Sequence, residues 1–360
     1  MNGDHIMTDS STVSRPAPSQ GSSKETAGTP SPLFRTRISG TGSYLPEKLL
    51  TNADIEKLVD TNDQWIRERT GIEARHIAAD DQATSDLGLI AAQRALEASG
   101  LKPEDIDLII FCTVSPDHVM PSAACLLQKK LGARHVMSFD LSAACSGFIY
   151  GLSIADQFIR TGVHKHVLVV GAEVLHRYVN YQDRETCILF GDGAGAVIAS
   201  RATDNQDSRI LSFHLLADGN LGDLLLLPAG GSAIPFSQNV LDQNLQYVQM
   251  KGREIFKNAV RAMSETSQEA LDTNHLSIDQ IDWLIPHQAN LRIIDAVGRH
   301  FGIPAEKVVI NVQHTGNTSA ATIPIALDEA VRDGRIKREQ MVLLTAFGAG
   351  LTSGSLLFKF

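Results

Sequence analysis

The chain has 360 residues, 43% of them hydrophobic and 20% charged, and its formal net charge is -9. This acidic balance excludes general binding to nucleic acid, because no basic excess is present to neutralise phosphates. No apolar run of about 18 residues is present to span a bilayer, and the four cysteines are too widely spaced for a disulfide framework. We therefore expect a protein of the reducing cytoplasm.

Residues 1–33 form a tail dominated by Ser, Thr, Pro, Gly and Ala, for which we predict disorder. The tail lacks the apolar stretch that a secretory signal needs. It also carries Asp4, Asp9 and Glu25, whereas a transit peptide avoids acidic residues. We interpret it as a solvated segment.

Beyond the tail, short apolar segments of β type alternate with longer segments of helical period, which is typical of an α/β protein with buried sheets. Strands are predicted at 108–113, 167–171, 194–199, 283–286, 341–346 and 354–358. Helices are predicted at 85–99, 146–161, 252–271, 291–301 and 322–333. The chain is longer than one core usually fills, so we expect two domains or two similar halves.

A weak internal repeat supports the second possibility. Residues 104–109 resemble residues 279–284, which lie 175 positions later, and residues 167–169 resemble 342–344 at the same offset. Residues 159–162 resemble 331–334 at an offset of 172, which would make Asn317 the equivalent of Cys145. The predicted halves are residues 34–205 and 206–360.

Cys145 is a candidate nucleophile because it follows a run of small residues and precedes a predicted helix. The N–H groups and dipole at a helix start favour a thiolate and lower its pKa. A buried structural cysteine is an equally good interpretation on spacing alone, and it is the one that we adopt for Cys112, Cys125 and Cys187.

His287 and Asn317 also lie where a strand or turn leads into a predicted helix. Strand ends are where α/β folds place their sites. A structural histidine and a helix cap are the simpler interpretations, and we adopt the former for the other histidines. An amide and a histidine that face a thiol can donate hydrogen bonds to an enolate oxygen.

Two glycine-rich segments remain. Residues 191–196 lack the strand, loop and helix context of a phosphate-binding loop, so we attribute their glycines to close packing of a strand. Residues 347–351 follow a predicted strand, and their backbone N–H groups are candidates for an oxyanion hole.

Taken together, these motifs closely resemble β-ketoacyl-acyl-carrier-protein synthase III, a thiolase-fold family of condensing enzymes in bacterial fatty-acid synthesis. The match runs from about Arg35 to Phe360. It implies a homodimer of five-layered α/β/α/β/α subunits with two pseudo-symmetric halves. The motifs that carry it are residues 63–66, 69–72, 140–148, 190–195, 286–290, 316–321 and 347–350.

The resemblance implies a ping-pong condensation, with acyl-CoA and malonyl-acyl carrier protein as substrates and neither a cofactor nor a metal. Cys145 would take the acyl group, and the carrier-bound malonyl group would then lose carbon dioxide and attack it. His287 and Asn317 would stabilise the enolate, while the backbone N–H groups of Cys145 and Ala349 would hold the thioester oxyanion.

The resemblance also implies binding residues. Trp65 and Arg184 would flank the adenine of coenzyme A, with Arg69 near its phosphates. The acidic carrier protein would contact a local basic patch. Its implied contacts are Gln288, Ala289, Asn290, Leu291, Arg292, Lys257, Arg253 and Arg299.

Two departures from the family concern Met120 and Ser353. Met120 stands in the acyl pocket where some acetyl-selective members carry phenylalanine, and methionine fills space less rigidly. We therefore expect primers somewhat longer than acetyl. Ser353 stands where the family often has tryptophan, and nothing in the sequence explains this change.

Alternative functions share the same three residues. A thiolase-fold relative could condense acyl groups for a secondary metabolite or transfer them to a non-malonyl acceptor, and the sequence separates these poorly. A thiolase needs a second cysteine near the C-terminus, and none follows Cys187. A catalytically dead scaffold would lack one of the three, and a cysteine hydrolase would need a carboxylate to orient His287.

Overall fold

The computed structural model describes residues 33–203 and 206–360, so the predicted tail lies outside the described residues except for its last position. Within this part, each predicted strand and helix is present, with ends that differ from the prediction by at most two residues. No helix among the described residues is long and apolar enough to cross a membrane.

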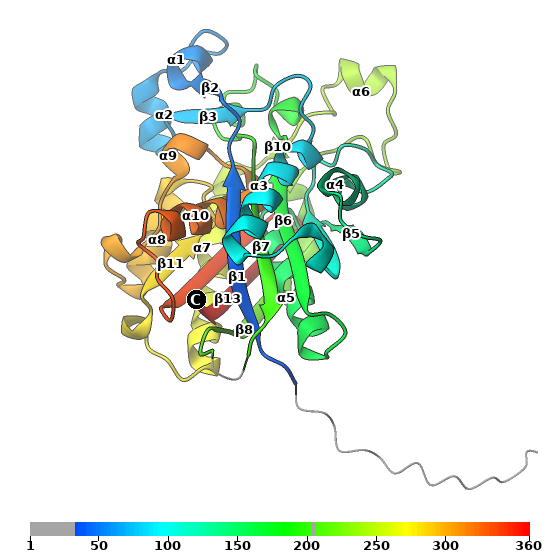
Figure 1. The fold of residues 1–360 in the computed structure, drawn as a ribbon. Helices are drawn as coiled ribbons and strands as arrows, with labels where there is room; N and C mark the ends of the chain where they lie inside the picture. Colours follow the sequence, from blue (N-terminus) through cyan, green and yellow to red (C-terminus); the bar gives the residue numbers. More distant parts are fainter. Residues whose placement is uncertain (1–32, 204–205) are drawn as a thin grey trace, which may run out of the picture. The chain divides into compact units, whose positions relative to one another are not determined.

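The first sheet has five strands in the order β1-β7-β6-β4-β5. The inner strands β6 and β4 are parallel, and between His166 and Glu173 at the two ends of β6 and along all of β4 they carry no polar side chain, because helices cover both of their faces. Helices α3 (Thr84–Ser99) and α4 (Ala123–Leu131) pack on the outer face (Figure 1). The strands are β1 (Thr36–Tyr44), β4 (Leu108–Cys112), β5 (Met137–Leu141), β6 (His166–Glu173) and β7 (Gly193–Arg201).

The second sheet has four strands in the order β11-β12-β13-β8. Its pairing directions match those of β4-β6-β7-β1 in the first sheet. Helices α7 (Gly252–Thr273) and α8 (Leu291–Phe301) pack on its outer face. The strands are β8 (Arg209–Ala217), β11 (Trp283–Pro286), β12 (Met341–Gly348) and β13 (Thr352–Lys359).

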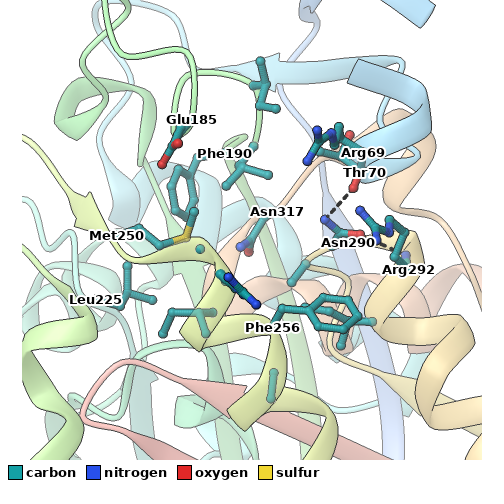
Figure 2. A pocket seen from close by; sticks show the side chains of 18 of the residues that line it. Arg69, Thr70, Glu185, Phe190, Leu225, Met250, Phe256, Asn290, Arg292 and Asn317 are labelled. Atoms are coloured by element: carbon teal, nitrogen blue, oxygen red, sulfur yellow. Dashed lines mark hydrogen bonds between the residues drawn. The ribbon is translucent and has the colours of Figure 1, made fainter. Parts of the chain in front are cut away.

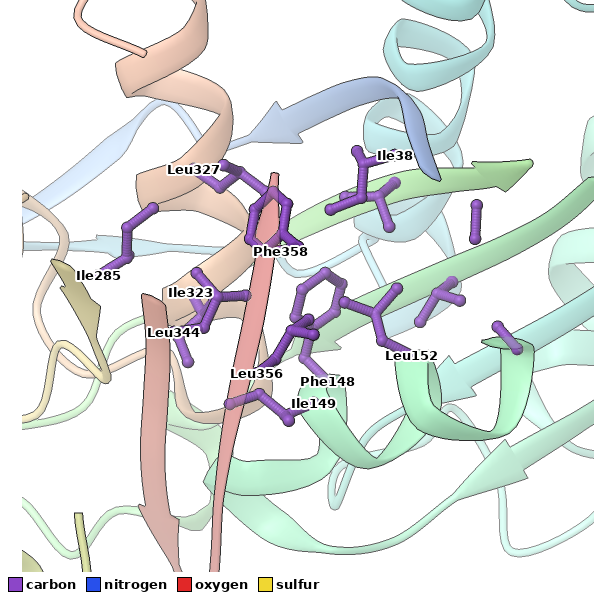
Figure 3. Packing of buried hydrophobic residues seen from close by; sticks show 14 of the residues in the cluster. Ile38, Phe148, Ile149, Leu152, Ile285, Ile323, Leu327, Leu344, Leu356 and Phe358 are labelled. Atoms are coloured by element: carbon purple, nitrogen blue, oxygen red, sulfur yellow. The ribbon is translucent and has the colours of Figure 1, made fainter. Parts of the chain in front are cut away.

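Helices α5 (Gly147–Arg160) and α10 (Thr322–Arg332) lie between the two sheets and complete five layers. Figure 3 shows Phe148 and Leu152 of α5 in one apolar cluster with Ile323 of α10 and with strand residues such as Leu356. This central cluster fixes where both helices begin. The fold is therefore the thiolase-like α/β/α/β/α arrangement, with two pseudo-symmetric halves.

Several shorter elements, among them α1, α2, β2, β3 and α9, lie near one another beyond one end of the first sheet (Figure 1). Asn62 caps the N-terminus of helix α2, because its side-chain oxygen accepts a hydrogen bond from the Trp65 N–H at 2.8 Å. The other short elements are β2 (Lys48–Thr51), α1 (Asn52–Ile55), α2 (Asp63–Thr70), β3 (Ala74–Ile77), η1 (Pro103–Asp105), η3 (His176–Tyr178), η4 (Gly219–Leu224), β9 (Leu225–Leu226), α6 (Gln238–Asp242), β10 (Gln249–Met250), η5 (Ile278–Gln280), η6 (Ala305–Lys307) and α9 (Val312–Thr315).

The structure corrects the register of the internal repeat. The short turn η2 (Ala144–Ser146) precedes α5, and η7 (Ser319–Ala321) precedes α10, at the offset of 175 residues. Ala144 and Ser319 both have left-handed backbone, with φ of 46° and 49°. The equivalent of Cys145 is therefore Ala320, and its pairing with Asn317 is wrong. The offset of 172 arose because α5 has 14 residues and α10 only 11.

Candidate active site

Cys145, His287 and Asn317 line one cavity of about 790 Å³. They come from three separate positions: the turn after β5, the end of β11, and the loop that leads into η7. Figure 2 shows Asn317 at the centre of this cavity, with Phe190 and Met250 on one side and Arg69, Asn290 and Arg292 on the other. The three candidate reacting groups are therefore brought together although 172 residues separate the first from the last.

Cys145 lies at the start of the central layer and is 7% exposed. Burial raises the pKa of its thiol to about 12, and a contact with Ser319 lowers it. Desolvation thus outweighs the lowering of the pKa that the helix start led us to expect. At Gly348 a Cβ atom would lie 2.7 Å from the Cys145 backbone nitrogen, so the end of β12 packs directly against the main chain of Cys145.

His287 is held on both sides by hydrogen bonds. Its backbone N–H donates to the Thr345 carbonyl at 2.8 Å, and its Nδ1 lies 2.7 Å from the Thr322 hydroxyl oxygen. Burial lowers the pKa of His287 to about 3, so the ring is neutral near pH 7. A neutral ring carries one N–H, and the Thr322 hydroxyl, which also reaches the Ser319 carbonyl at 2.9 Å, decides which nitrogen carries it.

Asn317 is oriented by its own loop. Its side-chain oxygen accepts a hydrogen bond from the Ser319 N–H at 2.9 Å, and its backbone N–H donates to the Leu189 carbonyl. Because the oxygen is engaged inside the loop, the amide nitrogen is the group that Asn317 presents to the cavity. The cavity thus combines a thiol with a neutral ring and an amide donor.

Aromatic and cationic side chains lie at the cavity rim. The Trp65 ring has the guanidinium carbon of Arg184 at 4.1 Å from its centre and that of Arg69 at 5.2 Å. Arg253 and Arg292 also line the cavity, and the guanidinium carbon of Arg292 lies 5.7 Å from the centre of the Phe256 ring. This rim suits an anionic ligand with a planar ring.

Other predicted contacts divide between the cavity and the surface. Ala289 and Asn290 line the cavity, and the Asn290 amide donates to the Arg69 carbonyl at 2.9 Å. Lys257 and Arg299 are exposed on α7 and α8, and neither they nor Leu291 belong to the cavity lining. Ala349 follows Gly348 immediately, beside the Cys145 backbone.

Two predicted contacts need correction. Gln288 is completely buried, and its amide binds the Pro286 and Val309 carbonyls, so its side chain cannot reach a carrier protein and instead fixes the loop after β11. Met120 is 82% exposed and does not line the cavity of its own chain. A role in the acyl pocket would require another copy of the chain.

The structure also shows buried polar residues that sequence reasoning missed. Glu173 ends β6 and is completely buried close to Cys145. Asp192 is equally buried and accepts hydrogen bonds from the backbone N–H groups of Ala78 and His176, which fixes the turn before β7. The sequence offered one signal for Glu173, which is a single acidic residue at the end of an otherwise apolar predicted strand. Within residues 33–203 and 206–360, no group of three His, Cys, Asp or Glu side chains is arranged to hold a metal ion.

Comparisons with known proteins identify sequences similar to this chain. Family models of 3-oxoacyl-[acyl-carrier-protein] synthase III match residues 139–219, and its C-terminal region matches residues 271–360. A β-ketoacyl-[acyl-carrier-protein] synthase III of Xanthomonas campestris pv. campestris is 53% identical over 325 residues, which cover 90% of this chain and 98% of the relative.

Solved structures show the same relationship. The 3-oxoacyl-[acyl-carrier-protein] synthase III of Aquifex aeolicus has a TM-score of 0.84 and 48% identity, and the match covers 90% of this chain and all of that one, 100%. The priming β-ketosynthase of the R1128 polyketide pathway has a TM-score of 0.84 and 34% identity, with coverage of 92% and 98%. Since the chain shares about half of its residues with relatives that it spans almost completely, it belongs to the β-ketoacyl-acyl-carrier-protein synthase III family of acyl-transferring condensing enzymes.

Proposed function

We propose that this enzyme condenses an acyl-CoA primer with malonyl-acyl carrier protein by a ping-pong route through an acyl-Cys145 intermediate. The observation that carries the proposal is the single cavity onto which Cys145, His287 and Asn317 all open. A thiol that faces two neutral hydrogen-bonding groups suits acyl capture followed by enolate formation.

In the first half-reaction, the rim binds acyl-CoA and the Cys145 sulfur attacks the thioester carbon. Trp65 and Arg184 stack on the adenine, and Arg69 contacts phosphate. The oxyanion is held by the backbone N–H groups of Cys145 and Ala349, which the close approach of Gly348 brings together. Coenzyme A then leaves, and the acyl group stays on sulfur.

In the second half-reaction, malonyl-acyl carrier protein enters the same cavity. Loss of carbon dioxide leaves an enolate whose oxygen accepts hydrogen bonds from His287 and from the Asn317 amide. Burial keeps His287 uncharged, so it serves as a donor only when the Thr322 hydroxyl turns to Nδ1 and the ring hydrogen is on Nε2. The enolate carbon attacks the acyl group and yields the 3-ketoacyl product.

The carrier protein is acidic in the family, and the cavity rim supplies opposite charge. Arg253 and Arg292 lie on the wall formed by α7 and α8, and Lys257 and Arg299 extend this surface as exposed cations. Charge complementarity of this kind raises the rate of encounter more than the final affinity. We assign this face to carrier docking.

We further propose a cytoplasmic homodimer that works without cofactor or metal. Val119 and Met120 are 89% and 82% exposed, which is a high cost for adjacent apolar side chains unless a second copy covers them. Met120 reaches an acyl pocket only if it enters the cavity of that second copy. Its flexibility then favours primers longer than acetyl.

A specialised pathway is the alternative setting, since the polyketide priming enzyme shares this fold and a third of its residues with the chain. Substrate choice separates the two. Purified protein mixed with malonyl-acyl carrier protein and acetyl-, butyryl- or octanoyl-CoA should yield 3-ketoacyl product, and Cys145→Ala should yield none. Absence of product with every primer would refute the proposed condensation, and strict acetyl preference would refute the role given to Met120.

A further inference from the structure

Glu173 is a buried carboxylate beside the nucleophile that the condensation described above does not use. Its Oε2 accepts hydrogen bonds from the Thr113 hydroxyl at 2.9 Å, the Ser115 hydroxyl at 2.5 Å, and the Val114 and Ser115 N–H groups, each at 3.1 Å. Its Oε1 accepts a longer hydrogen bond from the Val114 N–H, at 3.3 Å. Within residues 33–203 and 206–360, no Lys, Arg or His side chain forms an ion pair with it.

Ser319 connects this carboxylate to Cys145. The turn η7 packs both against η2, which carries Cys145, and against β6, which ends at Glu173. Ser319 is 3% exposed, and its hydroxyl has no partner in good hydrogen-bond geometry among the described residues. It is nevertheless close enough to lower the pKa of both the Cys145 thiol and the Glu173 carboxyl.

Hydrogen bonds fix the backbone of Ser319, whereas its hydroxyl has no such bond among the described residues. Its N–H binds the Asn317 side chain at 2.9 Å, and its carbonyl accepts from Thr322 at 2.9 Å. A buried hydroxyl without a partner is costly, so its retention between a thiol and a carboxylate calls for an explanation. A hydroxyl both donates and accepts, which is what a proton relay requires.

The electrostatics of the site favour transfer of a proton from one buried group to another over the creation of an additional buried charge. Burial raises the pKa of Cys145 to about 12, and the Glu173 charge raises it as well. Two further ionisable groups near Glu173, those of Cys112 and Tyr178, also have a pKa raised by burial and by Glu173. A second buried anion here would carry a large desolvation free energy. If the thiol proton passes to Glu173, the buried charge stays constant, and burial has already raised the pKa of that carboxyl.

We propose that Glu173 stores the Cys145 proton between the two half-reactions, with the Ser319 hydroxyl as the relay. During acyl transfer, the S–H bond breaks, its proton goes to the Ser319 oxygen, and the serine's own proton passes to Glu173. The sulfur bonds to the acyl carbon as the carbon–sulfur bond to coenzyme A breaks, and the released thiolate takes a proton from water. During condensation, the enolate carbon displaces Cys145, whose sulfur regains the stored proton by the same route.

This inference rests on the proposed function, and proton uptake tests it directly. Wild-type enzyme in weakly buffered solution near neutral pH is mixed with acyl-CoA alone, and an indicator dye follows the proton concentration. Because the free coenzyme A thiol is protonated by solvent, about one proton should be taken up per acylated Cys145. Ser319→Ala, which removes a hydroxyl without a partner, should abolish the uptake and slow acylation at least 10-fold.

Ser264→Ala is the matched control, because Ser264 is also a buried serine without a hydroxyl partner but lies on α7 in a groove away from Cys145. It should leave uptake and acylation unchanged. Glu173→Gln should behave like Ser319→Ala, and its difference infrared spectrum on acylation should lack a protonated-carboxyl band that wild type shows.

Alkylation of Cys145 by iodoacetamide separates the relay from a simple charge effect. If Glu173 acts only as a nearby negative charge, Glu173→Gln lowers the thiol pKa and alkylation accelerates, whereas loss of a proton acceptor slows it. Acceleration, or acylation of wild type without proton uptake, would overturn the inference and leave the condensation intact. Failure of the proposed function looks different, since no acyl-CoA would then acylate Cys145.

Discussion

The guanidinium carbon of Arg184 lies 4.1 Å from the centre of the Trp65 ring, so two side chains assigned to the adenine are in contact with each other. A planar ring between them needs about 7 Å, twice the usual contact distance of about 3.5 Å between carbon atoms. The proposed adenine site therefore requires Arg184 to move away from Trp65 before the ring is enclosed.

Trp65→Ala should accordingly weaken acyl-CoA binding. Loss of ring stacking and of its attraction for Arg184 corresponds to about 1–2 kcal/mol, or roughly a 5- to 30-fold rise in KM. Steady-state kinetics with varied acyl-CoA measure this. Arg94→Ala removes a comparable contact, with Tyr44 at 5.8 Å and outside the cavity, and should leave KM unchanged. An unaltered KM in Trp65→Ala would place the adenine elsewhere.

Decarboxylation should separate the roles of Cys145 and His287. Cys145→Ala cannot form an acyl intermediate, so condensation is lost, but release of carbon dioxide from malonyl-acyl carrier protein continues at a reduced rate. His287→Ala removes a donor to the enolate oxygen and should slow that release by about 100-fold or more. Radiolabelled carbon dioxide provides the measurement. Equal loss in both variants would contradict the division of labour.

Gly348→Ala should damage the oxyanion hole more than the fold. A Cβ atom at this position lies 2.7 Å from the Cys145 nitrogen, so either strand or turn must shift. Displacement of one oxyanion donor costs about 100- to 1,000-fold in kcat. Gly219→Ala is the control, because its Cβ meets nothing within 4 Å. The acylation rate and the melting temperature together decide, and a variant with normal acylation would argue against this hole.

Charge reversal at Arg292 should weaken carrier docking without affecting the primer. Arg292→Glu is expected to raise KM for malonyl-acyl carrier protein by about 10-fold at low salt, with a smaller effect at high salt because ions screen the attraction. Arg261→Glu changes the same charge in a groove away from the cavity. If the two variants behave alike, the docking face assigned here is wrong.

Acid should destabilise the folded protein partly through His287, whose pKa falls from 6.5 to about 3 on burial. The folded state binds fewer protons than the unfolded chain between these values, so this contribution is complete above about pH 6.5 and is lost as the pH falls toward 3. Urea unfolding between pH 4 and 7 should show a shallower pH dependence for His287→Gln.

The inner strands were predictable because burial on both faces leaves a continuous apolar run, as in 108–112. The edge strands β1 and β8 were missed. In β1, Gly40 and Gly42 weaken the strand pattern, yet both are needed because the α3 backbone at Ala95 and Ala91 leaves no room for a side chain. That requirement is a tertiary contact, and local sequence does not reveal it.

Sequence motifs predicted Cys145, His287 and Asn317 as site residues, and the structure brings them to one cavity. Each could be predicted because it lies at a junction between two secondary-structure elements. The same reasoning failed for Gln288, whose polar side chain is used inside the loop, and for Met120, whose setting lies outside its own chain. Glu173 and Thr322 form hydrogen bonds with residues that are distant in sequence. Only the folded structure shows that these residues lie close together.

The central layer links packing to reactivity. Cys145 stands directly before α5, Thr322 begins α10, and Phe148 and Ile323 near those starts share one apolar cluster. A substitution that alters how these helices meet moves both Cys145 and Thr322, the hydrogen-bond partner of the His287 ring. Substitutions in this layer should therefore be tolerated mainly as compensating pairs, with one residue in each half of the chain. A mismatched pair should lower the turnover rate before it lowers the stability of the fold.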